Sequence, residues 1–202
     1  MLFLRSGDEA PLAAWASRPF APTTERGPGP NDARDSYERV IGNEAPGSPE
    51  ADGLHRRAGT AILAYDIFPP SVGRGVVVRE PLEVGDTVGL RYRIVLGLEM
   101  FFASRVVARF DEQRGQTWHT GFTYRTLAGH PELGEETFSV EKNLSTGEVL
   151  VALRSWSRPG IWLTKLGAPV ARRTQVRSTR AALEHLQQRA LSASRPAAAS
   201  AR

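Results

Sequence analysis

The sequence predicts an α+β domain in which a curved antiparallel sheet of about six to seven strands grips a long C-terminal helix. Three segments support this prediction: a helical pattern after Leu54, a series of alternating apolar and polar residues from Gly75 to Ser157, and a second helical pattern after Pro159. The sheet and the helix each have one apolar face, and each can cover the other. This order is the helix-grip arrangement, and we expect it to span residues 35–190 as one domain.

Both ends of the chain lack a core-forming pattern. Residues 1–34 hold five prolines and scattered glycines, which predicts a proline-rich arm that is irregular or disordered, either resting on the domain or loose in solvent. Residues 191–202 are rich in alanine and serine, and we predict a disordered tail there. We expect no signal peptide, because charged residues interrupt the first apolar run.

The first part of the domain should contain a strand and a helix. The segment Asp35–Gly42 is consistent with a short strand. From Leu54 onward, apolar residues recur at helical spacing, and this helix must end before Pro69. The residues on its apolar side are Leu54, Ala58, Ala61, Ile62 and Tyr65.

Alternation then predicts six consecutive strands. Their expected ranges are 76–80, 87–97, 100–112, 117–127, 136–143 and 148–157. In the third of these strands, alternation places Phe102, Val106 and Phe110 inward and Arg105 and Arg109 outward.

We expect residues 127–134 to connect two antiparallel strands, because glycine and proline break the alternation there. After the last strand, Ser157 and Pro159 predict the start of a helix. That helix should have a short lead and a long final part, whose apolar stripe is Val176, Leu183, Leu186 and Ala190.

The composition excludes some classes of site. Cysteine is absent, so disulfides, thiolate metal sites and cysteine nucleophiles are excluded, and a cytoplasmic location is the expectation. No metal-binding spacing, phosphate-binding glycine loop or serine-hydrolase motif is present. We therefore expect no metal and no cofactor. We also expect no membrane partner, because no apolar run could span a bilayer.

Positive charge is concentrated near the C-terminus. From Lys165 onward there are eight basic residues and one acidic residue, against 18 basic and 21 acidic residues before it. Arg172, Arg173, Arg177 and Arg180 could bind an acidic partner, which would make the chain an interaction protein. A solvated helix face explains them better, and nucleic acid is an unlikely partner.

The run from Gly121 to Gln175 resembles an uncharacterised family catalogued as domain of unknown function 1990, found in bacteria and plants. The similarity lies in a Gly-His pair before Gly-Glu-Glu, a Gly-Glu-Val turn and a Ser-Arg-Pro junction. The chain departs from the family pattern at Arg125, Trp156 and Ala168, where many members have glycine, phenylalanine and tyrosine. The resemblance implies a fold like the START and plant-allergen ligand-binding domains, and it implies no reaction.

His130 and Glu136 are the candidate catalytic residues. A histidine beside carboxylates can be tuned towards neutral pH and can exchange protons with a substrate. Alternation places Glu136 inward and Glu135 outward. The competing interpretation is structural: His130 caps the turn, and Glu136 pairs with a buried arginine such as Arg105 or Arg154.

Several aromatic residues share the inward parity of their strands. They either fill a solid core or line a pocket for a small molecule. The leading hypothesis is a binding module for an apolar or amphipathic molecule, with Tyr124, Glu136 and Arg105 as polar anchors. An enzyme that uses His130 and Glu136 is the alternative, and the oligomeric state is undetermined. The full set of expected ligand-binding residues is Tyr92, Phe102, Arg105, Trp118, Phe122, Tyr124, Glu136 and Phe138.

Overall fold

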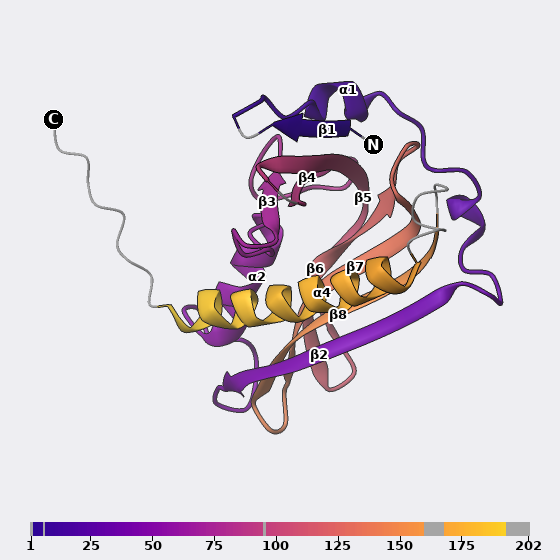
Figure 1. Cartoon of the computed structure of the whole chain (residues 1–202). Helices are drawn as coiled ribbons and strands as arrows, with labels where there is room; N and C mark the ends of the chain where they lie inside the picture. Colours follow the sequence, from indigo (N-terminus) through magenta and orange to yellow (C-terminus); the bar gives the residue numbers. More distant parts are fainter. Residues whose placement is uncertain (1, 6, 95, 160–167, 193–202) are drawn as a thin grey trace, which may run out of the picture.

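The computed structural model describes residues 2–5, 7–94, 96–159 and 168–192, with side chains throughout except at 159 and 168–172. One long sheet curves around a C-terminal helix (Figure 1). The strands are β1 (Leu2–Arg5), β2 (Ala33–Asn43), β3 (Gly73–Val76), β4 (Thr87–Arg93), β5 (Leu98–Arg114), β6 (Thr117–Thr126), β7 (Glu132–Asn143) and β8 (Glu148–Pro159). The helices are α1 (Leu12–Ala16), the short 3₁₀ helix η1 (Thr24–Arg26), α2 (Leu54–Leu63) and α4 (Ala168–Leu191).

The sheet confirms the predicted fold class. Its strand order is β2-β8-β7-β6-β5-β4-β3, and β1 pairs with β5 beside this path. All pairs are antiparallel, including the chain-distant pair of β2 with β8. The eight strands exceed the predicted six to seven because the N-terminal arm contributes β1.

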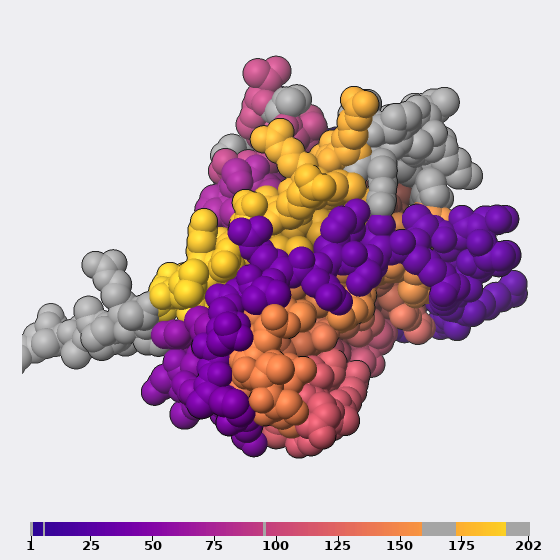
Figure 2. Space-filling model, turned by 90° about the horizontal axis from the view of Figure 1, so that it is seen from below, coloured from indigo at the N-terminus to yellow at the C-terminus, as the bar shows by residue number. Residues whose placement is uncertain are grey.

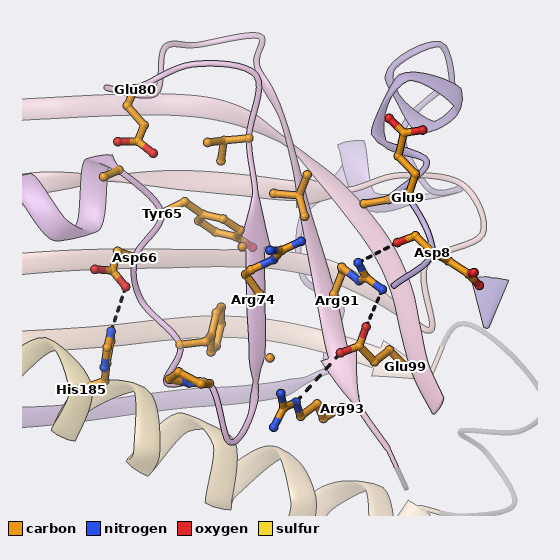
Figure 3. A pocket seen from close by; sticks show the side chains of 18 of the residues that line it. Asp8, Glu9, Tyr65, Asp66, Arg74, Glu80, Arg91, Arg93, Glu99 and His185 are labelled. Atoms are coloured by element: carbon orange, nitrogen blue, oxygen red, sulfur yellow. Dashed lines mark hydrogen bonds and ion pairs between the residues drawn. The ribbon is translucent and has the colours of Figure 1, made fainter. Parts of the chain in front are cut away.

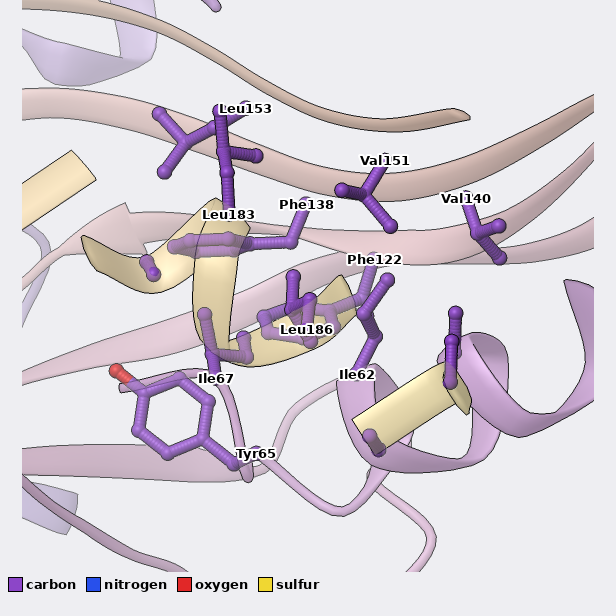
Figure 4. Packing of buried hydrophobic residues seen from close by; sticks show 14 of the residues in the cluster. Ile62, Tyr65, Ile67, Phe122, Phe138, Val140, Val151, Leu153, Leu183 and Leu186 are labelled. Atoms are coloured by element: carbon purple, nitrogen blue, oxygen red, sulfur yellow. The ribbon is translucent and has the colours of Figure 1, made fainter. Parts of the chain in front are cut away.

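Helices α2 and α4 cover one face of the sheet, called the inner face here. Phe122 on β6 lies directly opposite Phe138 on β7, and their rings lie 5.5 Å apart. Leu183 and Leu186 of α4 belong to the same buried cluster (Figure 4). Leu183, Leu186 and Ala190 of the predicted stripe are confirmed as core residues, whereas Val176 lies outside this cluster, beside the exposed arginines of α4.

A β-bulge changes the predicted face of two residues on β5. The register with β6 shifts between Val106 and Ala108, so one extra residue is inserted into β5. Beyond the bulge, Arg109 lies opposite inward-facing Phe122, and Phe110 lies opposite Gly121 on the other face. The predicted inward position of Phe110 and outward position of Arg109 are wrong, because strict alternation does not survive an inserted residue.

The N-terminal arm rests on the outer face of the sheet. Irregular structure was expected for residues 1–34, but β1, α1 and η1 form regular elements there, and Trp15 of α1 is buried edge-on against Phe101 of β5. Packing of this indole against the sheet stabilises the arm, although the sequence of the arm has no long regular apolar pattern. Of the predicted tail, 191–202, residues 193–202 lie outside the described residues.

Several boundaries differ from the predicted ones. Strand β3 ends at Val76 rather than spanning 76–80. Helix α2 ends at Leu63, because Tyr65 adopts a left-handed conformation with φ of +57°. Ser157 does not cap a helix, because it lies within β8, where it pairs with Ala33 of β2. The expected short lead helix falls on residues 160–167, outside the described residues.

A buried ion pair fixes the end of the sheet opposite the N-terminal end of α4. The ammonium group of Lys142 on β7 lies 2.7 Å from Glu44, and neither side chain is exposed. Glu44 also accepts hydrogen bonds from the backbone N–H groups of His55 and Glu50. This network ties the loop before α2 to the sheet. None of the helices described is long and apolar enough to cross a membrane.

Candidate functional site

The β6–β7 connection positions the candidate residues. Strand β6 ends at Thr126 and β7 begins at Glu132, so a connection between antiparallel strands is confirmed, but it spans 127–131 and the predicted range of 127–134 is three residues too long. Gly129 has a φ of +94°, a conformation that glycine adopts without strain. The backbone N–H of His130 donates to the Leu127 carbonyl at 3.0 Å, so the turn closes with the imidazole beneath the sheet.

Glu136 faces inward, as predicted, and accepts a short hydrogen bond from the hydroxyl of Tyr124 on β6. Burial raises the pKa of Glu136 to about 7; the Tyr124 hydrogen bond lowers it in part, and the nearby charges of Glu132 and Asp35 raise it further. Burial also raises the pKa of Tyr124, which keeps its hydroxyl protonated as the donor. Glu136 therefore exchanges its proton near neutral pH.

His130 contributes a neutral imidazole to the same region. Its Nδ1 lies 2.7 Å from the Glu132 carbonyl oxygen and 3.1 Å from the Glu132 backbone nitrogen, so Nδ1 donates to the carbonyl in one tautomer and accepts from the N–H in the other. Burial lowers the pKa of His130 to about 3, so the ring stays uncharged at physiological pH. Nε2 is buried and has no hydrogen-bond partner among the residues described. A buried polar atom of this kind is costly unless something pairs with it.

His130, Tyr124 and Glu136 line one small pocket at the end of the sheet nearest the start of α4. Its volume is about 40 Å³, enough for a polar group of a few atoms. Thr126, Ser155, Ser157 and Gln175 add hydroxyl and amide groups to its wall. The pocket can therefore hydrogen-bond a small polar group and can transfer one proton at Glu136.

Sequence reasoning missed the contributions of β8 and α4. Ser155 and Ser157 share the inward parity of Leu153 on β8, and this signal could have identified them. Gln175 donates to Glu132 at 3.3 Å from α4. Nothing local in the sequence points to that contact, because it depends on where the helix crosses the sheet.

The predicted arginine partner of Glu136 is wrong. Arg105 faces outward and donates to the carbonyls of Ala16 and Arg18, where it holds the arm in place. Arg154 also faces outward and bonds Glu141 and Glu38. On both strands these arginine side chains point to the outer face of the sheet, so they cannot reach the pocket on the inner face. Arg105 is therefore no anchor for this pocket.

The expected aromatic residues divide into three groups. Phe122 and Phe138 are fully buried in the core and line no cavity. Trp118 lies at the other end of β6, where its indole N–H donates to Asp111 at 2.7 Å. Tyr92 and Phe102 remain near the pocket: the Phe102 ring lies 4.6 Å from the His130 ring, and the Tyr92 hydroxyl bonds Ser178 of α4 at 3.0 Å.

A larger, open cleft of about 990 Å³ lies beside edge strand β3 (Figure 3). Many of its charged side chains already bond each other. Asp66 lies 2.9 Å from His185 and 2.6 Å from Arg189, and Arg91 lies 2.7 Å from Glu99. These pairs occupy part of the charged wall of the cleft, and Arg91 Nε remains buried there without a hydrogen-bond partner among the residues described.

The basic face of α4 is exposed. Arg173, Arg177 and Arg180 face solvent, as expected of a solvated helix surface, and Glu184 lies on the same surface. The side chain of Arg172 lies outside the described set. An interaction role for this face stays a prediction.

Comparison with known proteins identifies the family. The family model described as a domain of unknown function (DUF1990) matches residues 20–185. The chain belongs to this family. A UPF0548 protein of Dictyostelium discoideum is 34% identical over 99 residues, a match that covers 46% of this chain and 45% of that protein. The chain thus matches about half the length of that curated relative.

Solved structures confirm the helix-grip fold. The ginseng major latex-like protein 151 from Panax ginseng is similar with a TM-score of 0.51 at 16% identity, covering 80% of this chain and 99% of that one. A hypothetical protein from Helicobacter pylori gives a TM-score of 0.53 at 14% identity, covering 80% and 89%. At these identities the likeness establishes the fold alone.

Proposed function

We propose that this DUF1990 protein is a binding module that holds a small amphipathic molecule between the sheet and α4, with the molecule's polar end beside Glu136. The observation that carries the proposal is the convergence of Glu136, Tyr124 and the partnerless Nε2 of His130 on one pocket. A bound hydroxyl, which can both donate and accept, would give this Nε2 the hydrogen bond that it lacks among the residues described.

The apolar end of the ligand would lie against Phe102 and Tyr92. Both rings are only partly buried, and Phe102 packs edge-on against His130. Aromatic rings beside a few polar groups are the usual composition of a small-molecule site. The core around Phe122 and Phe138 is already filled, so the ligand would occupy only this end of the space between sheet and helix.

Ligand-induced stabilisation tests this proposal. Decanol, decylamine and decanoic acid present three different polar ends on one apolar chain, and a molecule that binds only the folded state raises the melting temperature. At least one of them should stabilise the wild type, and Glu136→Gln should lose most of that effect. Native mass spectrometry of the protein purified from cells should show a copurified small molecule.

Glu135→Gln is the matched control. Glu135 adjoins Glu136 and borders the pocket, but its carboxylate lies on the outer face, where it bonds Arg125 at 2.6 Å. Its substitution should leave ligand stabilisation intact. The proposal fails if none of the probes stabilises the wild type and no mass copurifies, or if the two variants respond alike.

Acid–base catalysis is the second candidate, and the raised pKa of Glu136 favours it. A carboxyl with a pKa of about 7 is poised to give and take a proton near neutral pH, and such catalysis contributes about 10²- to 10⁴-fold to a rate. Any activity found in a substrate screen should titrate near pH 7 and vanish in Glu136→Gln. An activity that persists in this variant would exclude the mechanism.

A further inference from the structure

A second polar cleft lies on the outer face of the sheet, and no described residue of the N-terminal arm or of α4 lines it. Strands β5, β6, β7 and β8 form its walls, and its volume is about 410 Å³. The β5–β6 and β7–β8 hairpins, which border the cleft at one end, lie side by side at the surface (Figure 2). This volume is within the range of small-molecule sites.

The register of the strands explains why this part of the outer face is hollow. The bulge beside Val106 turns Phe110 to the outer face, where it lies opposite Gly121, and Gly121 lies opposite Ser139 on β7. Because glycine has no side chain, nothing fills the space between Phe110 and the short side chain of Ser139. The Phe110 ring therefore forms an apolar wall of the cleft.

The polar side chains of the cleft form a network below the surface. Ser139 and Glu141 are buried, and the Ser139 hydroxyl donates to the Glu141 carboxylate at 2.9 Å. Arg154 donates to the same carboxylate. The imidazole Nδ1 of His119 lies 3.6 Å from Glu141, and no hydrogen bond among the residues described involves Nε2 of that ring. Nε2 can donate or accept, according to the tautomer.

Two threonine hydroxyls complete the polar wall. Thr123 on β6 lies opposite Thr137 on β7, and their hydroxyl oxygens are 2.8 Å apart. Both residues are partly exposed and line the cleft. Only one of the two hydroxyls can donate to the other, so one hydrogen and several lone pairs remain for a ligand.

The arginines of the cleft already have carboxylate partners. Arg154 bonds Glu38 at 2.6 Å in addition to Glu141, and Arg114 bonds Glu112 at 2.7 Å. A charged ligand would have to displace one of these pairs or lie beside a like charge. The cleft therefore favours a neutral ligand with several hydroxyl groups.

We propose that this outer cleft binds a neutral sugar residue. Each hydroxyl of a pyranose can both donate and accept, which matches Thr123, Thr137 and Nε2 of His119. The C–H face of the sugar ring would lie against Phe110. Glu136 lies on the opposite face of the sheet, so this proposal does not depend on the inner pocket.

Saturation-transfer NMR with glucose, galactose and mannose tests the proposal. At least one of these sugars should receive saturation from the wild-type protein. The double variant Thr123→Val with Thr137→Val replaces both hydroxyls by methyl groups of similar shape, so it should fold normally. It should weaken sugar binding by about tenfold, because a bound sugar loses two hydrogen-bonding partners. Glucuronate and glucosamine, which carry charge on the same ring, should bind more weakly than the neutral sugar.

Thr117→Val is the matched control. Thr117 has the same parity on β6 as Thr123 but does not line the cleft. Its substitution should change the sugar affinity by less than about twofold. The proposal is overturned if none of the three neutral sugars binds, or if the control loses as much affinity as the double variant. Tighter binding of glucuronate or glucosamine than of every neutral sugar would also overturn it, because the cleft would then select charge.

Discussion

Glu136 and Lys142 both lie on the inner face of strand β7, and their surroundings differ sharply. Lys142 bonds Glu44 at 2.7 Å and the Ser48 carbonyl at 3.0 Å within a closed network. Glu136 has the Tyr124 hydroxyl as its hydrogen-bond partner, and burial raises its pKa to about 7. The same face of one strand therefore holds an ion pair at one end and, at the other, an acid without a cationic partner among the residues described.

The Lys142 end of β7 contributes to stability, whereas the Glu136 end is the candidate functional site. Burial alone would raise the pKa of Glu44, but the hydrogen bonds from Lys142, His55 and Glu50 lower it overall. Each buried charge at that end has its counterpart, so the pair maintains the fold. At the Glu136 end no cation compensates this carboxyl among the residues described. The fold accepts that cost where a ligand or substrate can interact with the acid.

The largest expected effect on the unfolding free energy is at the Lys142 end of β7. Lys142→Met leaves Glu44 buried without its cation, which should cost about 3 to 5 kcal/mol of unfolding free energy. Urea unfolding at neutral pH measures it. Arg114→Met is the control, because Arg114 pairs with Glu112 at the exposed surface and should cost less than about 1 kcal/mol. Similar small losses in both variants would show that the Lys142 pair is solvated.

The unfolding free energy contributed by Glu136 should depend on pH. The folded-state pKa of Glu136 lies above its unfolded value, so its contribution is fully present below about pH 4.5 and is lost as pH rises to about 7. Over that window the wild type should lose on the order of 3 kcal/mol relative to Glu136→Gln. Urea unfolding of both proteins across this range measures the difference. A pH-independent difference would mean that Glu136 titrates normally.

A smaller effect should follow from Tyr124→Phe. This variant removes the donor that stabilises the Glu136 carboxylate, so it should raise the pKa of Glu136 further and cost about 1 to 2 kcal/mol at pH 8. The cost should shrink at pH 5, where the acid is protonated. Tyr92→Phe removes a neutral hydrogen bond to Ser178, and its cost should not change with pH. Equal pH profiles for the two variants would contradict the assignment.

Local alternation predicted much of this site. It placed Glu136 inward and Glu135 outward, and the turn between β6 and β7 follows from its glycines and proline. Alternation could not foresee the bulge beside Val106, which moves Phe110 to the outer face. Lys142 has inward parity too, but its partner Glu44 is 98 residues away. Contacts at that separation depend on how the loop before α2 packs on the sheet.

The most direct test is an NMR titration of the Glu136 side-chain carboxyl carbon, assigned by its loss in Glu136→Gln. The central claim is that this half-buried acid lies beside Tyr124 without a cation among the residues described, which predicts a midpoint near pH 7. Glu135, paired with Arg125 on the outer face, is the internal reference in the same spectra. A midpoint for Glu136 near its ordinary value of about 4.5 would contradict the claim, because it would place the carboxyl in water or beside a cation.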